Sequence, residues 1–266
     1  MRKLQTVVHS VSQQVAVEFR TFWRSRQTIY LTFLVPMLGM ALFVYLNGEG
    51  MLESAFAALF RGRAVLNDVS AMTLMTLGLI VYCIVDVAFE SMVPRLVRER
   101  SAGIYKRLGG TPLPVWALLL AKSLTAGIIV LLEIALILAM GLLSADITMA
   151  GSPWLLGAIA LLGTFTTTAL GFALSSVTAS AEGAVVAVHA IYIPMLFLCG
   201  AFVPLQALPR LLQVVARAVP LTYFVAPFHS VMVGGASVRG IWIDLLILLA
   251  WLLGAWFVAV KTFRWQ

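Results

Sequence analysis

The chain has 266 residues, of which 62% are hydrophobic and 11% are charged, and its mean hydropathy is +1.02. Soluble domains carry about 25% charged residues, so this composition excludes a soluble globular protein and predicts an all-α, polytopic membrane protein. The net charge of +7 does not indicate nucleic acid binding, because the basic residues flank apolar segments. Cys83 and Cys199 lie inside apolar runs, which predicts buried free thiols and no disulfide.

Residues 1–28 are expected to form an amphipathic helix that lies in the plane of the membrane interface. Arg20, Arg24 and Arg26 mark the point where the chain enters the membrane. The alternative is that this segment is only the basic flank of a first span. The apolar stripe of the expected helix consists of Leu4, Val8, Val11, Val15, Phe19 and Phe22.

Six apolar runs are long enough to cross a bilayer, which takes about 20 residues. Twelve of the 18 Lys and Arg residues fall in the N-terminal segment, the loop 91–114 and the C-terminus, and five fall in the loops between the other span ends. This asymmetry predicts cytoplasmic termini and a cytoplasmic loop 91–114, with 47–68 and 204–240 external. The third span is long and is expected to be broken or strongly tilted. The predicted spans are 29–46, 69–90, 115–143, 154–178, 183–203 and 241–260.

The loop 91–114 is charged and contains clear start and stop signals for helices. Arg98, Glu99 and Arg100 fit a polar helix that ends near Gly103, and Thr111 and Pro112 fit the start of the next helix. A loop of this kind can dock a soluble partner. The alternative is that its arginines only set the topology, although an acid among five bases is not needed for that purpose.

Several ionisable residues fall inside the spans, where charges are costly and usually have a task. Asp86 and Glu90 lie four residues apart, and Lys122 is expected to pair with one of them and so to link the two stems of the loop. A proton relay is the second possibility for these three. Glu133 lies near the middle of its span and is a candidate for the transport path, or else bonds to a Ser or Thr of a neighbouring helix.

Other polar residues in the spans are expected to pack. Thr167 belongs to a threonine cluster that either bonds its own backbone or lines a path. His189 is expected to be a packed histidine, and the three histidines are too dispersed for a metal site. No Ser/His/Asp site can be assembled, and the two halves share no matching string, so neither an intramembrane enzyme nor a carrier built from inverted repeats is favoured.

The segment 204–240 begins where a span reaches the far side and then breaks. Pro204, Pro209 and Pro220 interrupt the apolar pattern, and backbone in lipid cannot leave its polar groups unpaired. A short amphipathic helix is expected after Pro209, lying in the interface or dipping back from it. This layout is typical of a transport protein.

Two strings carry a resemblance to a known family. The string ERSAGIYKRLGGTPLP resembles the segment after the second span of type-2 ATP-binding-cassette permeases, which are drug and polysaccharide exporters. The string CGAFVPLQALPRLLQVVARAVPLTYFV is similar to the C-terminal signature of the same family. In the first string the matching positions are Glu99, Gly103, Leu108, Thr111 and Pro112, and in the second they are Gly200, Phe202, Pro204, Leu208, Pro209, Pro220, Leu221, Thr222 and Tyr223.

The resemblance implies a non-catalytic permease subunit, in which two membrane subunits work on two ATPase subunits. The chain has no phosphate-binding loop of the G-x-x-x-x-G-K-[ST] type, so ATP and Mg are expected in the partner ATPase. The second permease is either the same chain or a related one. The family also has an arginine after the Pro-Leu-Thr-Tyr string, where this chain has His229. The residues expected to couple to the ATPase are Arg98, Glu99, Arg100, Gly103, Leu108, Thr111, Pro112 and Glu182, the last lying in the short turn 178–183.

The leading hypothesis is therefore an exporter subunit in the plasma membrane that moves an amphipathic or hydrophobic substrate outward, such as a drug-like molecule, a lipid or a lipid-linked glycan. The few charges in the spans favour such a substrate over a polar solute. Two alternatives stay open. One is an ion-coupled carrier or channel that uses Asp86, Glu90 and Glu133, and the other is a non-transporting membrane scaffold.

Overall fold

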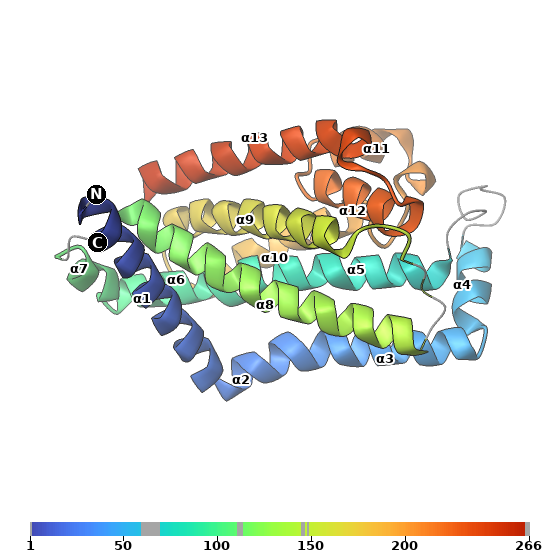
Figure 1. The fold of residues 1–266 in the computed structure, drawn as a ribbon, viewed down its shortest axis with the longest axis horizontal. Coiled ribbons are helices and arrows are strands. Elements are labelled where there is room, and N and C mark those ends of the chain that lie inside the picture. The colour runs from blue at the N-terminus through green and yellow to red at the C-terminus, as the bar shows by residue number, and fades with distance from the viewer. Residues whose placement is uncertain (1, 60–69, 111–113, 145–146, 148, 264–266) are drawn as a thin grey trace.

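Long apolar helices, packed side by side, make up most of the structure, a computed structural model that describes residues 2–59, 70–110, 114–144, 147 and 149–263 (Figure 1). Within these ranges all regular structure is helical. Six helical segments are long and apolar enough to cross a membrane, as expected. These segments are Tyr30–Gly48 (η1 and α3), Ala71–Ser101 (α5, η3 and α6), Val115–Leu143 (α8), Pro153–Val177 (α9), Ala181–Leu198 (α10) and Val238–Thr262 (α13).

The second and fifth spans differ most from their predicted bounds, and the fifth, α10, ends at Leu198 and not at residue 203. The second continues as helix to Ser101 instead of ending at residue 90, so much of the predicted loop 91–114 is an extension of this span. The third, α8 (Val115–Ser144), is one continuous helix that runs obliquely to α5 (Figure 1), so it is tilted against its neighbour and not broken.

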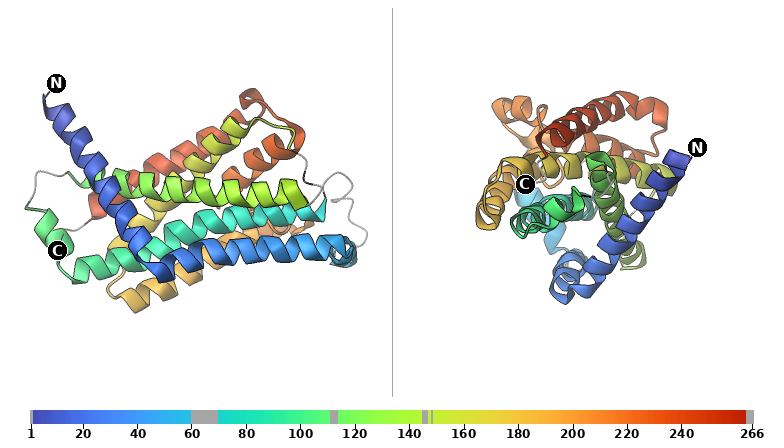
Figure 2. Two further views of the ribbon diagram at one scale, coloured as in Figure 1. Left: turned by 60° about the horizontal axis from the view of Figure 1, so that its bottom comes forward. Right: turned by 90° about the vertical axis from the view of Figure 1, so that its left-hand side faces the viewer.

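The shorter helices gather at the two ends of the bundle. The helices α1 (Arg2–Arg24), α2 (Arg26–Ile29) and α7 (Ile104–Leu108) lie at the end where α13 finishes, and α1 runs obliquely to the bundle axis (Figures 1 and 2). The helices α4 (Met51–Leu59) and α11 (Arg210–Ala216) lie at the opposite end. The two sets of loops that the charge pattern separated therefore lie at opposite ends of the molecule.

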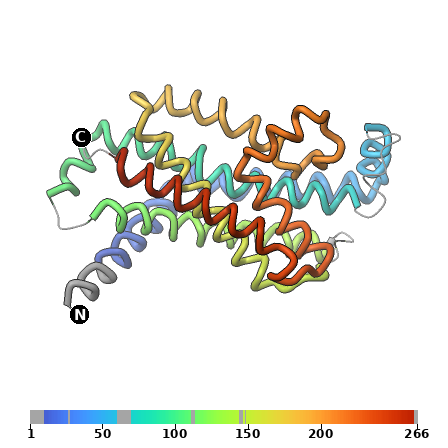
Figure 3. The backbone as a smooth tube through the Cα atoms, turned by 90° about the horizontal axis from the view of Figure 1, so that it is seen from above, coloured from blue at the N-terminus to red at the C-terminus, as the bar shows by residue number. Residues whose placement is uncertain are grey.

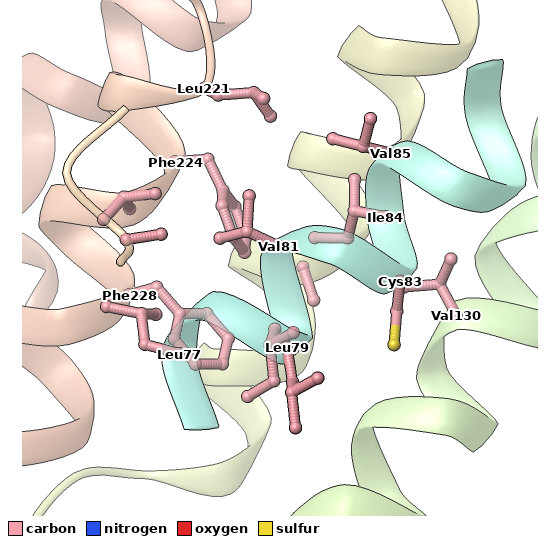
Figure 4. Packing of buried hydrophobic residues seen from close by; sticks show 14 of the residues in the cluster. Leu77, Leu79, Val81, Cys83, Ile84, Val85, Val130, Leu221, Phe224 and Phe228 are labelled. Carbon is pink, nitrogen blue, oxygen red and sulfur yellow. The ribbon is translucent and has the colours of Figure 1, made fainter. Parts of the chain in front are cut away.

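The core is built around α5 (Ala71–Val85), which is buried along most of its length. The helix α12 (Thr222–Gly234) packs against it, with Phe224 and Phe228 turned toward Val81 and Leu77 (Figure 4). A Cβ atom on Gly163 of α9 would lie 2.6 Å from the Phe224 ring, so the glycine is what lets the ring sit against the helix. At 13 residues α12 is too short to span a bilayer, which fits the expected re-entrant region.

Two π-helical segments interrupt the spans, and each lies just before a proline. They are η1 (Tyr30–Leu34), followed by Pro36, and η3 (Asp86–Ser91), followed by Pro94. Proline removes one N–H donor, and its ring clashes with the carbonyl four residues earlier. A wide π turn relieves that clash without breaking the helix, and such turns are frequent at functional sites. The turn at η3 sets how Asp86 and Glu90 face relative to α6.

Candidate functional site

Charged side chains from three helices meet inside the protein near the end that carries α7. Glu18 comes from α1, Arg95 and Glu99 lie one turn apart on α6 (Met92–Ser101), and Lys122 lies on α8. We call these four residues the charge cluster. It joins the amphipathic N-terminal helix to both stems of the segment 91–114.

The geometry of the charge cluster is tight. Lys122 Nζ lies 2.6 Å from Glu18 Oε1 and 3.0 Å from Glu99 Oε2. Arg95 Nε lies 2.8 Å from Glu99 Oε1, and a terminal nitrogen of Arg95 contacts the second oxygen of Glu18. The side chains of Lys122 and Glu18 are only 5% and 7% exposed, so solvent screens their interaction little.

Two acids and two bases balance each other in the charge cluster, which offsets the cost of removing them from water. Tyr105 of α7 adds a hydrogen bond, because its hydroxyl donates to Glu99 Oε2 at 2.5 Å. Burial and the nearby charge of Glu99 raise the pKa of Tyr105 well above its ordinary value, so the phenol keeps the proton that it donates. Glu99 thus ties α6, α7 and α8 together.

The prediction that Lys122 pairs with Asp86 or Glu90 is wrong. Lys122 pairs with Glu18 and Glu99, and not with Asp86 or Glu90. The prediction assumed that the second span ends at residue 90, whereas the helix continues and carries Glu99 to the level of Lys122. Lys122 does link the two stems of the segment, but through a different acid.

Glu18 was missed by the sequence analysis. It lies between Val15 and Phe22 on the stripe that was assigned to lipid, and it is buried. An acid on the apolar face of an amphipathic helix is the signal that could have found it, since such a position demands a buried cation. Gln14, one turn away, donates to Glu18 at 3.3 Å.

Arg100 connects the same segment to the next pair of spans. It donates to the carbonyl of Ser175 at 2.9 Å and to that of Thr178, which lie at the C-terminal end of α9. Free carbonyls at a helix end favour a cation. Ser180 then caps α10, accepting from the Gly183 amide at 3.0 Å, and Glu182 is exposed in its first turn.

The hairpin formed by α6 and α7 (residues 92–110) presents an exposed basic edge. Gly103 turns the chain between the helices with φ of 70°, a left-handed conformation that favours glycine. Arg98, Lys106 and Arg107 are exposed, whereas Leu108 packs beside the buried Tyr105. Thr111 and Pro112, also predicted to couple, lie outside the described residues.

A cavity of about 50 Å³ adjoins the charge cluster. A space of this size holds a water molecule where polar groups line it. The charge cluster therefore borders a space large enough for water. The cavity is lined by Glu18, Phe22, Val87, Ser91, Met92, Arg95, Lys122, Thr125, Ala126 and Ile129.

The polar residues predicted inside the spans do not form one network with Lys122. Glu90 accepts a hydrogen bond from Tyr192 of α10 at 3.1 Å and lies 3.6 Å from His189 Nε2. Glu133 is 2% exposed, and neither of its carboxylate oxygens has a hydrogen-bond partner among the described residues. The Thr167 hydroxyl donates to carbonyls of its own helix, as the packing interpretation predicts. Asp86 lies 3.5 Å from the Tyr82 hydroxyl.

The broken region at the other end closes its own hydrogen bonds. Pro209 precedes α11, and beyond Pro220 the hydroxyls of Thr222 and Tyr223 donate to the carbonyls of Ala216 and Arg217, both at 2.7 Å. The Arg217 carbonyl has no other partner in the described chain, whereas the Ala216 carbonyl also accepts from the Val219 amide at 3.0 Å. Both carbonyls end α11, where backbone groups near lipid need partners. The Pro-Leu-Thr-Tyr string therefore follows the end of a helix and donates hydrogen bonds to the last carbonyls of that helix.

The start of the broken region depends on close packing. Gly200 follows α10 with φ of 89°, and Pro204 begins the short turn η4 (Leu205–Ala207). Phe202 lies against Gly78 of α5, where a Cβ atom would approach its ring to 2.4 Å. The glycine on the central helix thus fixes the path of the chain as it leaves the membrane.

Within the described part of the chain, no group of three His, Cys, Asp or Glu side chains could hold a metal ion. Cys83 and Cys199 are both free and buried, as predicted. The fold defines a multi-pass membrane protein with a charged hairpin at one end of its bundle.

Comparison with known proteins identifies the family. The model of the ABC-2 type transporter family matches residues 11–233, so the chain belongs to this family. It is 28% identical over 173 residues to the inner membrane transport permease YhhJ of Escherichia coli, covering 64% of this chain and 46% of that protein. A second E. coli protein, named a probable multidrug ABC transporter permease, YbhR, is 25% identical over 154 residues, covering 58% and 42%. The chain thus spans less than half the length of these two relatives.

A relative from Bacillus subtilis, the transport permease YvfS, is 24% identical over 178 residues, which are 66% of this chain and 71% of that protein. The family implies a partner ATPase, which none of the comparisons describes in number or identity.

Proposed function

We propose that this permease is driven by a separate ATPase that acts on the hairpin of residues 92–110, in the inner membrane, to export an amphipathic or hydrophobic substrate. The observation that carries the proposal is the charge cluster, which ties the hairpin to α1 and α8. A force applied to α7 would reach α1 and α8 through Glu99 and Lys122. The membrane location follows a relative that is named an inner membrane transport permease, and a drug-like substrate follows one that is named a probable multidrug permease. The outward direction follows the resemblance of the two sequence strings to exporters.

The exposed edge of the hairpin suits a partner with acidic or carbonyl groups. Arg98, Lys106 and Arg107 are exposed on the hairpin. Glu182 lies in the first turn of α10, at the same end of the bundle. Electrostatic complementarity of this kind determines how fast and in which orientation partners meet. We propose two ATPase copies, which bind ATP and Mg, and two permease subunits, identical or related.

Nucleotide can drive such a change only if the ATPases bind one arrangement of the hairpins better than the other. The charge cluster offers an element with more than one arrangement, because Lys122 and Arg95 each contact the same two acids. A shift of α6 against α8 can exchange these pairs without leaving any charge unpaired.

The test is a purification of this chain from its native membrane in a gentle detergent, with the stoichiometry of co-purifying proteins and ATP hydrolysis recorded. An ATPase subunit near one-to-one with the permease, together with hydrolysis, is the expected result. Recovery of the chain without an ATPase and without hydrolysis, after reconstitution in lipid, would overturn the proposal and favour an ion-coupled carrier.

A further inference from the structure

Acidic side chains lie on an uncovered face at the depth of the spans. Glu90 and His189 are 41% and 38% exposed, and Asp86 is partly exposed one turn from Glu90. The helix α10 has 18 residues and is about 27 Å long, and His189 lies halfway along it, so this group lies at mid-depth of that span. Figure 3 shows α10 running beside α5 and α6.

Charge exposed at this depth is not compatible with contact to lipid tails. Ionisable residues within spans almost always face the interior of an assembly or a water-filled path, and they mark the route of a substrate or ion. Within the described residues, neither Asp86 nor Glu90 forms a salt bridge with a Lys or Arg. No Lys or Arg of the described residues therefore neutralises the acids of this face.

The contact between Glu90 and His189 lacks a donor. His189 Nδ1 lies 2.8 Å from the carbonyl of Val185, so Nδ1 carries the proton in a neutral ring and Nε2 is an acceptor. Nε2 then faces Glu90 Oε1, a second acceptor, at 3.6 Å. A positively charged N–H group from a ligand can donate to both atoms. Tyr192 donates to the other oxygen of Glu90 and adds an aromatic face that attracts cations.

Glu133 supplies a second, independent sign of a ligand behind this face. It is buried on α8 without a hydrogen-bond partner in the described chain. A negative charge on Asp86 would repel a negative charge on Glu133. Cys83, one turn from Asp86 on α5, lies within the electrostatic influence of both Glu133 and Asp86, so the two acids are close to the same part of α5. A buried carboxyl group without a partner is costly and needs a reason.

We propose that Asp86 and Glu90, with His189 and Tyr192 beside them and Glu133 behind, bind the positively charged group of an amphipathic cation on the substrate path. The inference rests on the proposed transport function and specifies the substrate class. The apolar part of the ligand would lie against the uncovered apolar faces of α3 and α10. The charged group would donate to the acids and to His189 Nε2.

The test measures equilibrium binding of radiolabelled dodecylammonium, an amphipathic cation with N–H donors, to the purified permease, with any ATPase that accompanies it, in lipid nanodiscs without nucleotide. Dodecyl sulfate, an anion with the same apolar chain, is the matched ligand control, and empty nanodiscs give the background. Asp244→Asn, which removes an acid of α13, is the matched variant control. Saturable binding of the cation but not of the anion is expected.

Glu90→Gln and Asp86→Asn should each weaken cation binding at least about tenfold, the effect of one lost charge-assisted hydrogen bond. Glu133→Gln keeps the shape of a buried side chain and should weaken cation binding by a smaller factor. Asp244→Asn should leave cation binding unchanged. Equal binding of the cation and the anion, or wild-type affinity in Glu90→Gln, Asp86→Asn and Glu133→Gln, would overturn the inference.

Hydrolysis of ATP by the same preparation separates this inference from the proposed function. If the ATPase is active but cation binding does not depend on Asp86, Glu90 or Glu133, the cation site is overturned and the proposed function is not. If cation binding depends on these acids but no ATPase co-purifies with the chain, the cation site stands and the ATP-driven mechanism is overturned.

Discussion

Glu18 shows how strongly a single buried acid can constrain a membrane protein. It binds both cations of the charge cluster and is the only member that comes from α1. Removing one partner of a buried ion pair leaves an uncompensated charge, whereas replacing both partners with apolar groups is often neutral. The charge cluster therefore predicts a non-additive response to mutation.

Glu18→Gln should lower the stability of the protein by about 3 kcal/mol, because Lys122 loses the closer of its two acids in a buried site. Combining Glu18→Gln with Lys122→Met should recover part of that loss, since the unpaired ammonium is then absent. Thermal unfolding of the purified protein in detergent measures both effects. A double variant that is less stable than the wild type by the sum of the two single losses would show that the pair is not coupled.

The residues that sequence reasoning found are those with a local signature. Glu99 stood out as an acid among bases, and Gly103 does occupy a left-handed turn. Glu18 and the partner of Lys122 could not be found in this way, because both depend on which helices lie side by side and at what depth. The pairing Lys122–Glu99 follows only once the helix is known to continue beyond residue 90.

At the scale of elements, the broken region shows how a span ends at the far side of the membrane. The short helix predicted after Pro209 is α11, and its C-terminal carbonyls are satisfied by hydroxyls of the next helix. The six spans, this short helix and the proline breaks were all visible in the sequence. The π turns were not, because a proline alone does not tell whether a helix kinks, breaks or widens.

Tyr223→Phe should lower stability by about 1–2 kcal/mol, since it leaves the helix-end carbonyl of Arg217 without its donor. Thr222→Val should lower stability by less, because the Ala216 carbonyl still accepts from the Val219 amide. Tyr30→Phe removes the hydroxyl of an exposed tyrosine and is the matched control, with little expected change. The midpoint of thermal unfolding in detergent is the readout. A loss in Tyr30→Phe as large as that in Tyr223→Phe would contradict the capping role.

At the scale of the whole molecule, the two ends of the bundle differ in chemistry. The hairpin 92–110 and α1 lie at one end, and α4 and α11 lie at the other (Figure 1). The distribution of Lys and Arg predicts that the hairpin end is cytoplasmic. Both native cysteines are buried, so an introduced cysteine can be followed without removing them.

Arg210→Cys should react with a membrane-impermeant maleimide in intact cells, whereas Lys106→Cys should react only after the membrane is permeabilised. Both positions are exposed, so accessibility reports the side of the membrane and not burial. The opposite labelling pattern would invert the proposed topology.

The central claim is that a partner ATPase acts on the hairpin, and charge reversal at its exposed edge tests this most directly. The double variant Lys106→Glu, Arg107→Glu changes two exposed residues of α7, and Arg239→Glu changes an exposed residue at the start of α13 and serves as the control. We would measure the amount of ATPase retained per permease after purification in gentle detergent. The account predicts that the ATPase is lost from the α7 variant and retained by Arg239→Glu. Equal retention by both variants would contradict it.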